Sequence, residues 1–215
     1  MLRVSTPAVI CALMLSFGLA PMPAAEAGPP TDQLRDGIER IFKTLSDPEM
    51  SGEAKAPQRK ATVTRIAGEI FDFTEMSKRT LGQHWEKRSP AERQDFARLF
   101  TELIQRSYFS KVDEYGSEKT IFGSETVDGD HVVVRTKFLL PRGAQMPLDY
   151  SMHSVGGRWR VYDLSIDGIS LVANYRSQFN KIIRTSSYEG LVAKFKSNQA
   201  EFAGPSSAAS GKSTQ

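Results

Sequence analysis

The fold class is decided by one stretch of the sequence, His131-Val132-Val133-Val134-Arg135-Thr136-Lys137-Phe138-Leu139-Leu140. Every second position from Val132 to Leu140 shares one face, while Val133, Arg135 and Lys137 share the other. This period of two is typical of a β-strand with one buried face. The same alternation returns over residues 146–153, after a longer loop at 141–144. The two segments are therefore predicted to be antiparallel strands.

Turn signals on either side extend this pair of strands into a larger sheet. Asp128-Gly129-Asp130 separates residues 131–140 from a preceding strand at 120–127, and Gly156-Gly157 precedes a strand at 159–166. Short glycine-containing turns between alternating segments are typical of β-hairpins. Three consecutive hairpins predict a four-stranded antiparallel meander.

Both flanks of the sheet have helical periodicity, with apolar residues three to four positions apart. Before the sheet, stripes at 34–45 (behind a Thr31/Asp32 cap) and 63–71 are followed by helices opening at the capping boxes Asp72/Glu75 and Ser89/Glu92. After the sheet, stripes follow at 171–183 and 191–195. The expected fold class is α+β, a curved four-stranded antiparallel sheet whose concave face is packed by helices around an apolar pocket.

The two ends of the chain differ from this body. Residues 1–27 have the pattern of a secretory signal peptide, with Arg3, an apolar run from Val9 to Ala20 and the cleavage motif Ala25-Glu26-Ala27. Residues 203–215 are small, polar and rich in serine, which predicts a disordered tail. Residues 28–202 are then expected to form one domain, and the mature protein to be periplasmic.

Composition excludes several classes of protein. The chain has 215 residues, of which 40% are hydrophobic and 25% charged, an ordinary globular balance. The net charge of +3 is small and spread along the chain, so no nucleic-acid partner is expected. Cys11 is the single cysteine and lies in the leader, which excludes disulfides and cysteine-ligated zinc from the mature domain.

Residues with catalytic or metal-binding chemistry are sparse. The nucleotide-binding, metalloprotease and serine-hydrolase motifs are absent, and His84, His131 and His153 lie far apart in the sequence. Asp163 and Asp167 lie at a strand end, where turn and helix-cap roles explain them. We expect no enzyme, no metal and no cofactor.

Two longer motifs carry a family resemblance. Residues 71–85 with 89–96, and residues 159–179, resemble the MlaC or toluene-tolerance family of periplasmic substrate-binding proteins, and the order of elements agrees from about 32 to 200. The resemblance implies a cystatin/NTF2-like fold and a carrier of phospholipid. It also implies two partners, an outer-membrane lipoprotein complex and an inner-membrane ABC transporter complex, in a system that maintains outer-membrane lipid asymmetry.

Candidate lipid-binding residues come from the apolar faces of the central helix, the strands and the helix after the sheet. They are Phe96, Phe100, Leu103, Ile104, Tyr108, Val132, Val134, Phe138, Leu148, Tyr150, Tyr162, Leu164 and Tyr175. Those of the central helix are equally explained as ordinary core, because an amphipathic stripe normally packs on a sheet. The strand residues are the stronger candidates for a pocket wall.

Two alternative functions remain open at this point. One is a hopanoid-linked lipid-binding protein, since a subgroup of the family is associated with hopanoid biosynthesis. The other is an NTF2-like hydrolase or isomerase, which requires an acid–base pair inside the pocket, for example Tyr150 with Asp163.

Overall fold

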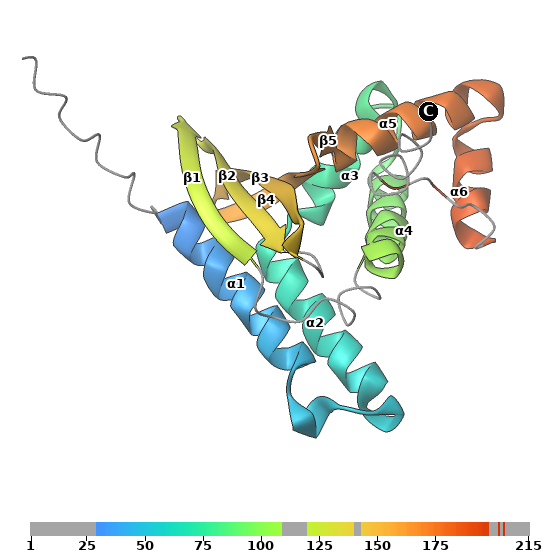
Figure 1. Cartoon of the computed structure of the whole chain (residues 1–215). Coiled ribbons are helices and arrows are strands. Elements are labelled where there is room, and N and C mark those ends of the chain that lie inside the picture. Colours follow the sequence, from blue (N-terminus) through green and yellow to red (C-terminus); the bar gives the residue numbers. More distant parts are fainter. Residues whose placement is uncertain (1–28, 109–119, 140–142, 198–201, 203, 205–215) are drawn as a thin grey trace, which may run out of the picture.

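The computed structural model describes residues 29–108, 120–139, 143–197, 202 and 204. The expected signal peptide and, except for Gly204, the expected tail lie outside these residues. Within them the fold is α+β, as predicted (Figure 1). Its α-helices and strands are α1 (Pro29–Leu45), α2 (Ala56–Ile70), α3 (Phe73–Leu81), α4 (Pro90–Tyr108), β1 (Thr120–Asp128), β2 (His131–Leu139), β3 (Gln145–Val155), β4 (Arg158–Ile166), β5 (Ile169–Ser170), α5 (Leu171–Thr185) and α6 (Tyr188–Lys196).

The sheet is antiparallel and its strands follow one another in chain order from β1 to β5. The predicted meander is confirmed, but the predicted number of four strands is wrong. Asp167 and Gly168 both have positive φ (50° and 78°), the backbone of a tight hairpin turn, and they fold Ile169–Ser170 back onto β4. The sequence suggested that Asp167 caps α5, and this prediction is wrong. Ser170 takes that role, and its hydroxyl accepts a hydrogen bond from the backbone N–H of Ala173.

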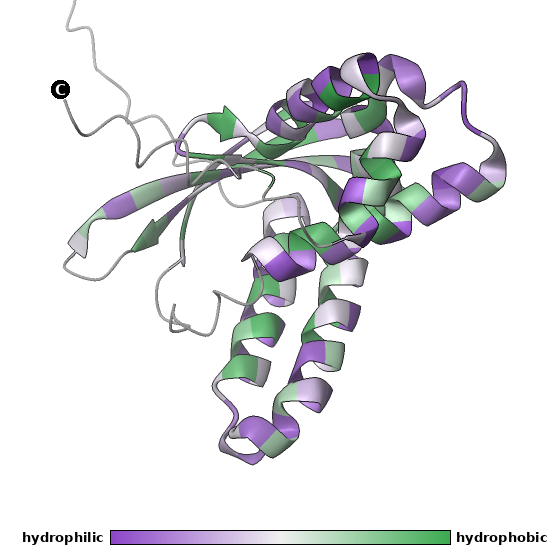
Figure 2. Cartoon of the chain, turned by 90° about the vertical axis from the view of Figure 1, so that its right-hand side faces the viewer, coloured by the Kyte–Doolittle hydropathy of each residue, from purple (hydrophilic) through white to green (hydrophobic). Residues whose placement is uncertain are grey.

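One face of the sheet is covered by α1 and α2, which continue past the strands as a helical hairpin (Figures 1 and 2). We call the apolar core on this face the sheet cluster. Its buried members are Leu34, Ile66, Ile70, Val132, Val134, Tyr150, Met152 and Val161. The two helices approach closely at Gly37, where an added Cβ would lie 2.6 Å from the side chain of Ile70.

A second core lies among α3, α4, α5 and α6, and we call it the helical cluster. Its buried members are Met76, Leu81, Trp85, Phe96, Leu99, Phe100, Leu103, Ile104, Leu171, Val172, Tyr175, Phe179, Tyr188, Leu191 and Phe195. Aromatic rings make up its centre: Phe100 meets Tyr175 edge-on at 5.6 Å, and Tyr175 stacks on Phe179 at 5.5 Å. Edge-on and offset contacts of this kind are the preferred geometries of aromatic pairs.

Phe71 connects the two cores. It leaves α2 in extended conformation and forms an isolated parallel bridge with Val161 at the edge of β4. The next residue, Asp72, donates its backbone N–H to the carbonyl of Val161 at 2.8 Å. The Phe71 side chain packs against both the sheet cluster and the helical cluster.

Besides the Asp167 cap, the sequence predicted three helix caps, and two of these are confirmed. Asp72 accepts from the N–H of Glu75 at 2.9 Å, and Ser89 and Glu92 form the predicted reciprocal capping box. The expected Thr31/Asp32 cap is wrong, because α1 already begins at Pro29, a position where proline is favourable. Buried Thr31 instead donates to the Glu125 carboxylate at 2.6 Å, which joins α1 to β1.

Candidate functional site

The thirteen residues predicted to bind lipid do not form one wall. Phe96, Phe100, Leu103, Ile104 and Tyr175 are buried in the helical cluster, and Tyr108 packs against it. Val132, Val134 and Tyr150 are buried in the sheet cluster, and Leu148 and Leu164 pack against it. Phe138 is buried and lies on the same face of β2 as Val134. Of the helices expected to pack on the sheet, α1 and α2 cover its inner face, whereas the central helix α4 packs in the helical cluster.

Tyr162 was expected on the inner face beside Leu164, and the structure corrects this. The register of β3 and β4 shifts there: Ser151 pairs with Asp163 and Met152 with Val161, so Tyr162 is the extra residue of a β-bulge. A bulge of one residue turns the next side chain to the other face. Tyr162 therefore lies on the outer face, edge-on to His153 at 5.4 Å and under the guanidinium of Arg79 at 4.1 Å.

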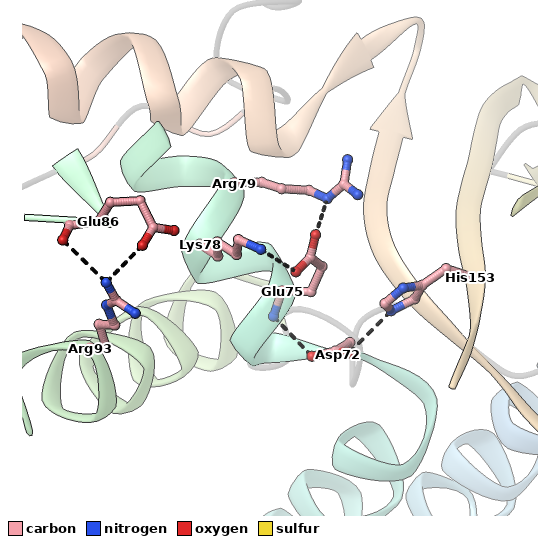
Figure 3. Close-up of polar contacts among 7 residues, drawn as sticks. All are labelled: Asp72, Glu75, Lys78, Arg79, Glu86, Arg93 and His153. Atoms are coloured by element: carbon pink, nitrogen blue, oxygen red, sulfur yellow. Dashed lines mark hydrogen bonds and ion pairs between the residues drawn. The ribbon is translucent and has the colours of Figure 1, made fainter. Parts of the chain in front are cut away.

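The outer face beside Tyr162 carries a group of polar contacts (Figure 3). His153 Nε2 lies 3.1 Å from the Asp72 carboxylate, and Arg79 donates to Glu75 at 2.8 Å. The side chains of His153 and Asp72 are each 18% exposed. Since Asp72 also caps α3, this contact ties the start of that helix to β3. The sequence favours a solvated position for both His131 and His153; His131 is exposed, but His153 is a half-buried structural residue.

The acid–base pair that an enzyme of this fold would need is not assembled. Tyr150 pairs with Leu164 and points into the sheet cluster, so Asp163, one residue away on β4, points to the other face. The Asp163 carboxylate already accepts from Ser170 Oγ and from the backbone N–H of Leu164 and Val172. Burial raises the pKa of the Tyr150 phenol, which keeps it protonated. Tyr150 and Asp163 therefore cannot act on one substrate atom.

A surface groove lies between α4 and α6, at the outer edge of the helical cluster. Its volume is about 490 Å³. Its walls combine small apolar side chains, charged side chains and one aromatic ring, namely Ala91, Glu92, Asp95, Tyr188, Glu189, Val192, Ala193 and Lys196. None of the thirteen predicted residues lines it, and sequence periodicity missed it because small residues on two separate helices give no joint signal.

Over the described ranges of the chain, no helix is both long and apolar enough to cross a membrane. The same ranges bring together no group of three or more His, Cys, Asp and Glu side chains suited to a metal ion. What the site offers is two packed apolar clusters that meet at Phe71.

Fold and site together define an α+β protein that shares its architecture with a solved phospholipid-binding protein. A solved phospholipid-binding protein from Ralstonia solanacearum, crystallised with a phospholipid, superimposes with a TM-score of 0.69 over 81% of this chain and 99% of that one. The two sequences are 21% identical, so the likeness is one of fold.

The family is established by sequence. The family model described as MlaC protein matches residues 35–197, and the chain belongs to this family, as its motifs had indicated. The toluene tolerance protein ttg2D of Pseudomonas putida is 27% identical over 119 residues, or 54% of this chain and 55% of that protein. The intermembrane phospholipid transport system binding protein MlaC of Haemophilus influenzae is 24% identical over 128 residues, or 57% and 60%. The matched region spans a little over half the length of these relatives.

Proposed function

We propose that this protein is a periplasmic carrier of phospholipid. The observation that carries the proposal is the family match over residues 35–197, because this range contains every buried residue of the sheet cluster except Leu34 and all of the helical cluster. The relatives named for phospholipid binding and intermembrane phospholipid transport support it.

The physical chemistry of the cargo explains why such a protein needs two apolar cores. Two acyl chains of about fourteen buried CH₂ groups each cost roughly 20 kcal/mol to expose to water, at about 0.8 kcal/mol per CH₂. A carrier must replace water around both chains with apolar side chains. We infer that the acyl chains enter between the sheet cluster and the helical cluster, which share Phe71 as a contact and are otherwise separate cores.

The route of the carrier follows from the ends of the sequence and from the family. Residues 1–27 carry the features of a cleaved signal peptide, so the mature chain begins at Gly28 and works in the periplasm. There it exchanges phospholipid with an outer-membrane lipoprotein complex and an inner-membrane ABC transporter complex, and so maintains outer-membrane lipid asymmetry.

The experiment is native mass spectrometry of the protein isolated from the periplasmic fraction of its host, followed by organic extraction. We expect a chain that starts at Gly28 and carries close to one extractable phospholipid. A hopanoid in the extract would replace phospholipid as the cargo. Lipid-free protein that also takes up no phospholipid from vesicles would contradict the carrier function.

A further inference from the structure

Two tyrosines of the helical cluster have buried hydroxyl groups that lack a hydrogen-bond partner. The phenol oxygens of Tyr108 and Tyr175 are both inaccessible to water, and neither has a partner among the described residues. Tyr188, at the other end of the same cluster, differs because its hydroxyl donates to the carbonyl of Glu92 at 3.2 Å. Buried polar groups are normally paired, so unpaired ones call for an explanation.

The described surroundings of the two phenols are mostly apolar, and their polar neighbours are the Ser107 hydroxyl and each other. The ring of Tyr175 contacts Phe100 at 5.6 Å and Phe202 at 6.4 Å. The Tyr108 hydroxyl lies against the backbone of Gly204, where an added Cβ would be only 2.6 Å away. Burial raises the pKa of both phenols, and the neighbouring Tyr175 raises that of Tyr108 further. Both groups are therefore protonated donors at neutral pH.

The two phenols cannot satisfy each other completely. A hydroxyl group has one hydrogen to donate and two lone pairs to accept with. When one phenol donates to the other, the second still has a hydrogen without an acceptor. A ligand with an acceptor oxygen would pair with that remaining hydrogen.

We propose that Tyr108 and Tyr175 form the polar end of the lipid site, where they donate a hydrogen bond to an ester carbonyl oxygen of a bound glycerophospholipid. This inference rests on the proposed carrier function. A neutral carbonyl fits this position better than the phosphate does, because the neighbours of the phenols among the described residues are rings, glycine backbone and the Ser107 hydroxyl, with no cation among them to compensate a buried negative charge. The contact fixes how deeply the acyl chains enter.

The test compares two phosphatidylethanolamines with equal chains and headgroup, one diacyl and one with both esters replaced by ether links. Uptake from vesicles is measured for the wild type and for Tyr108→Phe, Tyr175→Phe and the double variant. The wild type should prefer the diacyl lipid about three- to tenfold, the effect of one hydrogen bond, and the double variant should lose this preference. Tyr188→Phe is the matched control and should keep it.

Stability separates a ligand contact from a structural one. In delipidated protein Tyr175→Phe should leave the unfolding midpoint unchanged or raise it, whereas Tyr188→Phe should lower it, because the Tyr188 hydroxyl loses a hydrogen bond to the carbonyl of Glu92 while the Tyr175 hydroxyl makes no hydrogen bond of normal geometry. An equal diacyl preference in the wild type and the double variant would overturn the inference and leave the carrier function intact. A wild type that binds neither lipid would overturn both.

Discussion

At the scale of single residues, Asp163 shows how one carboxylate organises the end of the sheet. It lies on β4, yet it accepts from Ser170 Oγ at 2.5 Å and from the N–H of Val172 at 3.0 Å in the first turn of α5. It thereby joins β4, β5 and α5 at one point. Asp167, four residues later, is exposed and occupies a turn position of positive φ.

Asp163→Asn should therefore lower the free energy of unfolding by roughly 1–3 kcal/mol, because an amide NH₂ cannot accept the bonds that a carboxylate oxygen accepts. Lipid content should not change, since the side chain points away from the sheet cluster. Asp167→Asn is the matched control and should be neutral, because asparagine tolerates positive φ well. Chemical denaturation and lipid extraction measure both outcomes. An uncleaved substrate retained by Asp163→Asn would instead favour the enzyme alternative.

The wrong prediction for Tyr162 and the missed fifth strand have physical causes. The position of Tyr162 could not be predicted from alternation, because a β-bulge adds one residue and reverses the faces beyond it. The fifth strand did have a signal, since Asp167-Gly168 is a typical hairpin dipeptide. The adjoining helical stripe concealed it, because only two residues separate the turn from α5.

At the scale of elements, the packing of α1 on α2 depends on a missing side chain. Gly37 is buried at the contact, and an added Cβ would meet Cγ1 and Cδ1 of Ile70 at 2.6 Å. Gly68, on α2, has open space where an added Cβ would lie. The two helical glycines therefore provide a matched pair.

Gly37→Ala should destabilise the protein by about 1–3 kcal/mol through overpacking against Ile70. Gly68→Ala should stabilise it by about 0.5–1 kcal/mol, because alanine has the higher helix propensity and meets no neighbour. Thermal unfolding of the two variants gives the comparison. Stabilisation by both alanines would mean that α1 and α2 pack less closely than the structure has them.

The capping box of α4 makes the stability of the folded protein depend on pH. The backbone N–H and the hydroxyl of Ser89 lower the pKa of Glu92 below its ordinary 4.5. A carboxyl whose pKa is lowered by folding stabilises the folded state above the unfolded pKa, and this contribution disappears as the pH falls through the lowered value. The wild type should thus have a higher unfolding midpoint than Glu92→Gln at pH 7, and this difference should vanish in acid. A difference independent of pH would contradict this assignment.

At the scale of the whole molecule, the sequence predicted the helices and the sheet but not which helices pack on the sheet. The strands, the helices and two capping boxes follow from local periodicity and turn chemistry, and the family follows from two motifs. Local periodicity does not tell which helices cover the sheet, since each helix has an apolar stripe. For this reason Phe100 and Val134 are both candidate lipid-binding residues by sequence, although they belong to different clusters.

The division into two clusters is central to the proposed carrier function, because the cargo is proposed to lie between them. The competing location is the α4–α6 groove, which is already open at the surface. Its charged lining of Glu92, Asp95, Glu189 and Lys196 suits a dry acyl chain poorly. The two locations share no predicted lipid-binding residue, so a labelling experiment distinguishes them.

The most direct measurement is photocrosslinking with a phosphatidylethanolamine that carries a diazirine near the end of one acyl chain, followed by peptide mass spectrometry. If the acyl chains lie between the two clusters, labels are expected in both, at residues such as Phe100 in the helical cluster and Leu148 beside the sheet cluster. Labels confined to Ala91 and Val192 in the α4–α6 groove, or to a single cluster, would contradict this location.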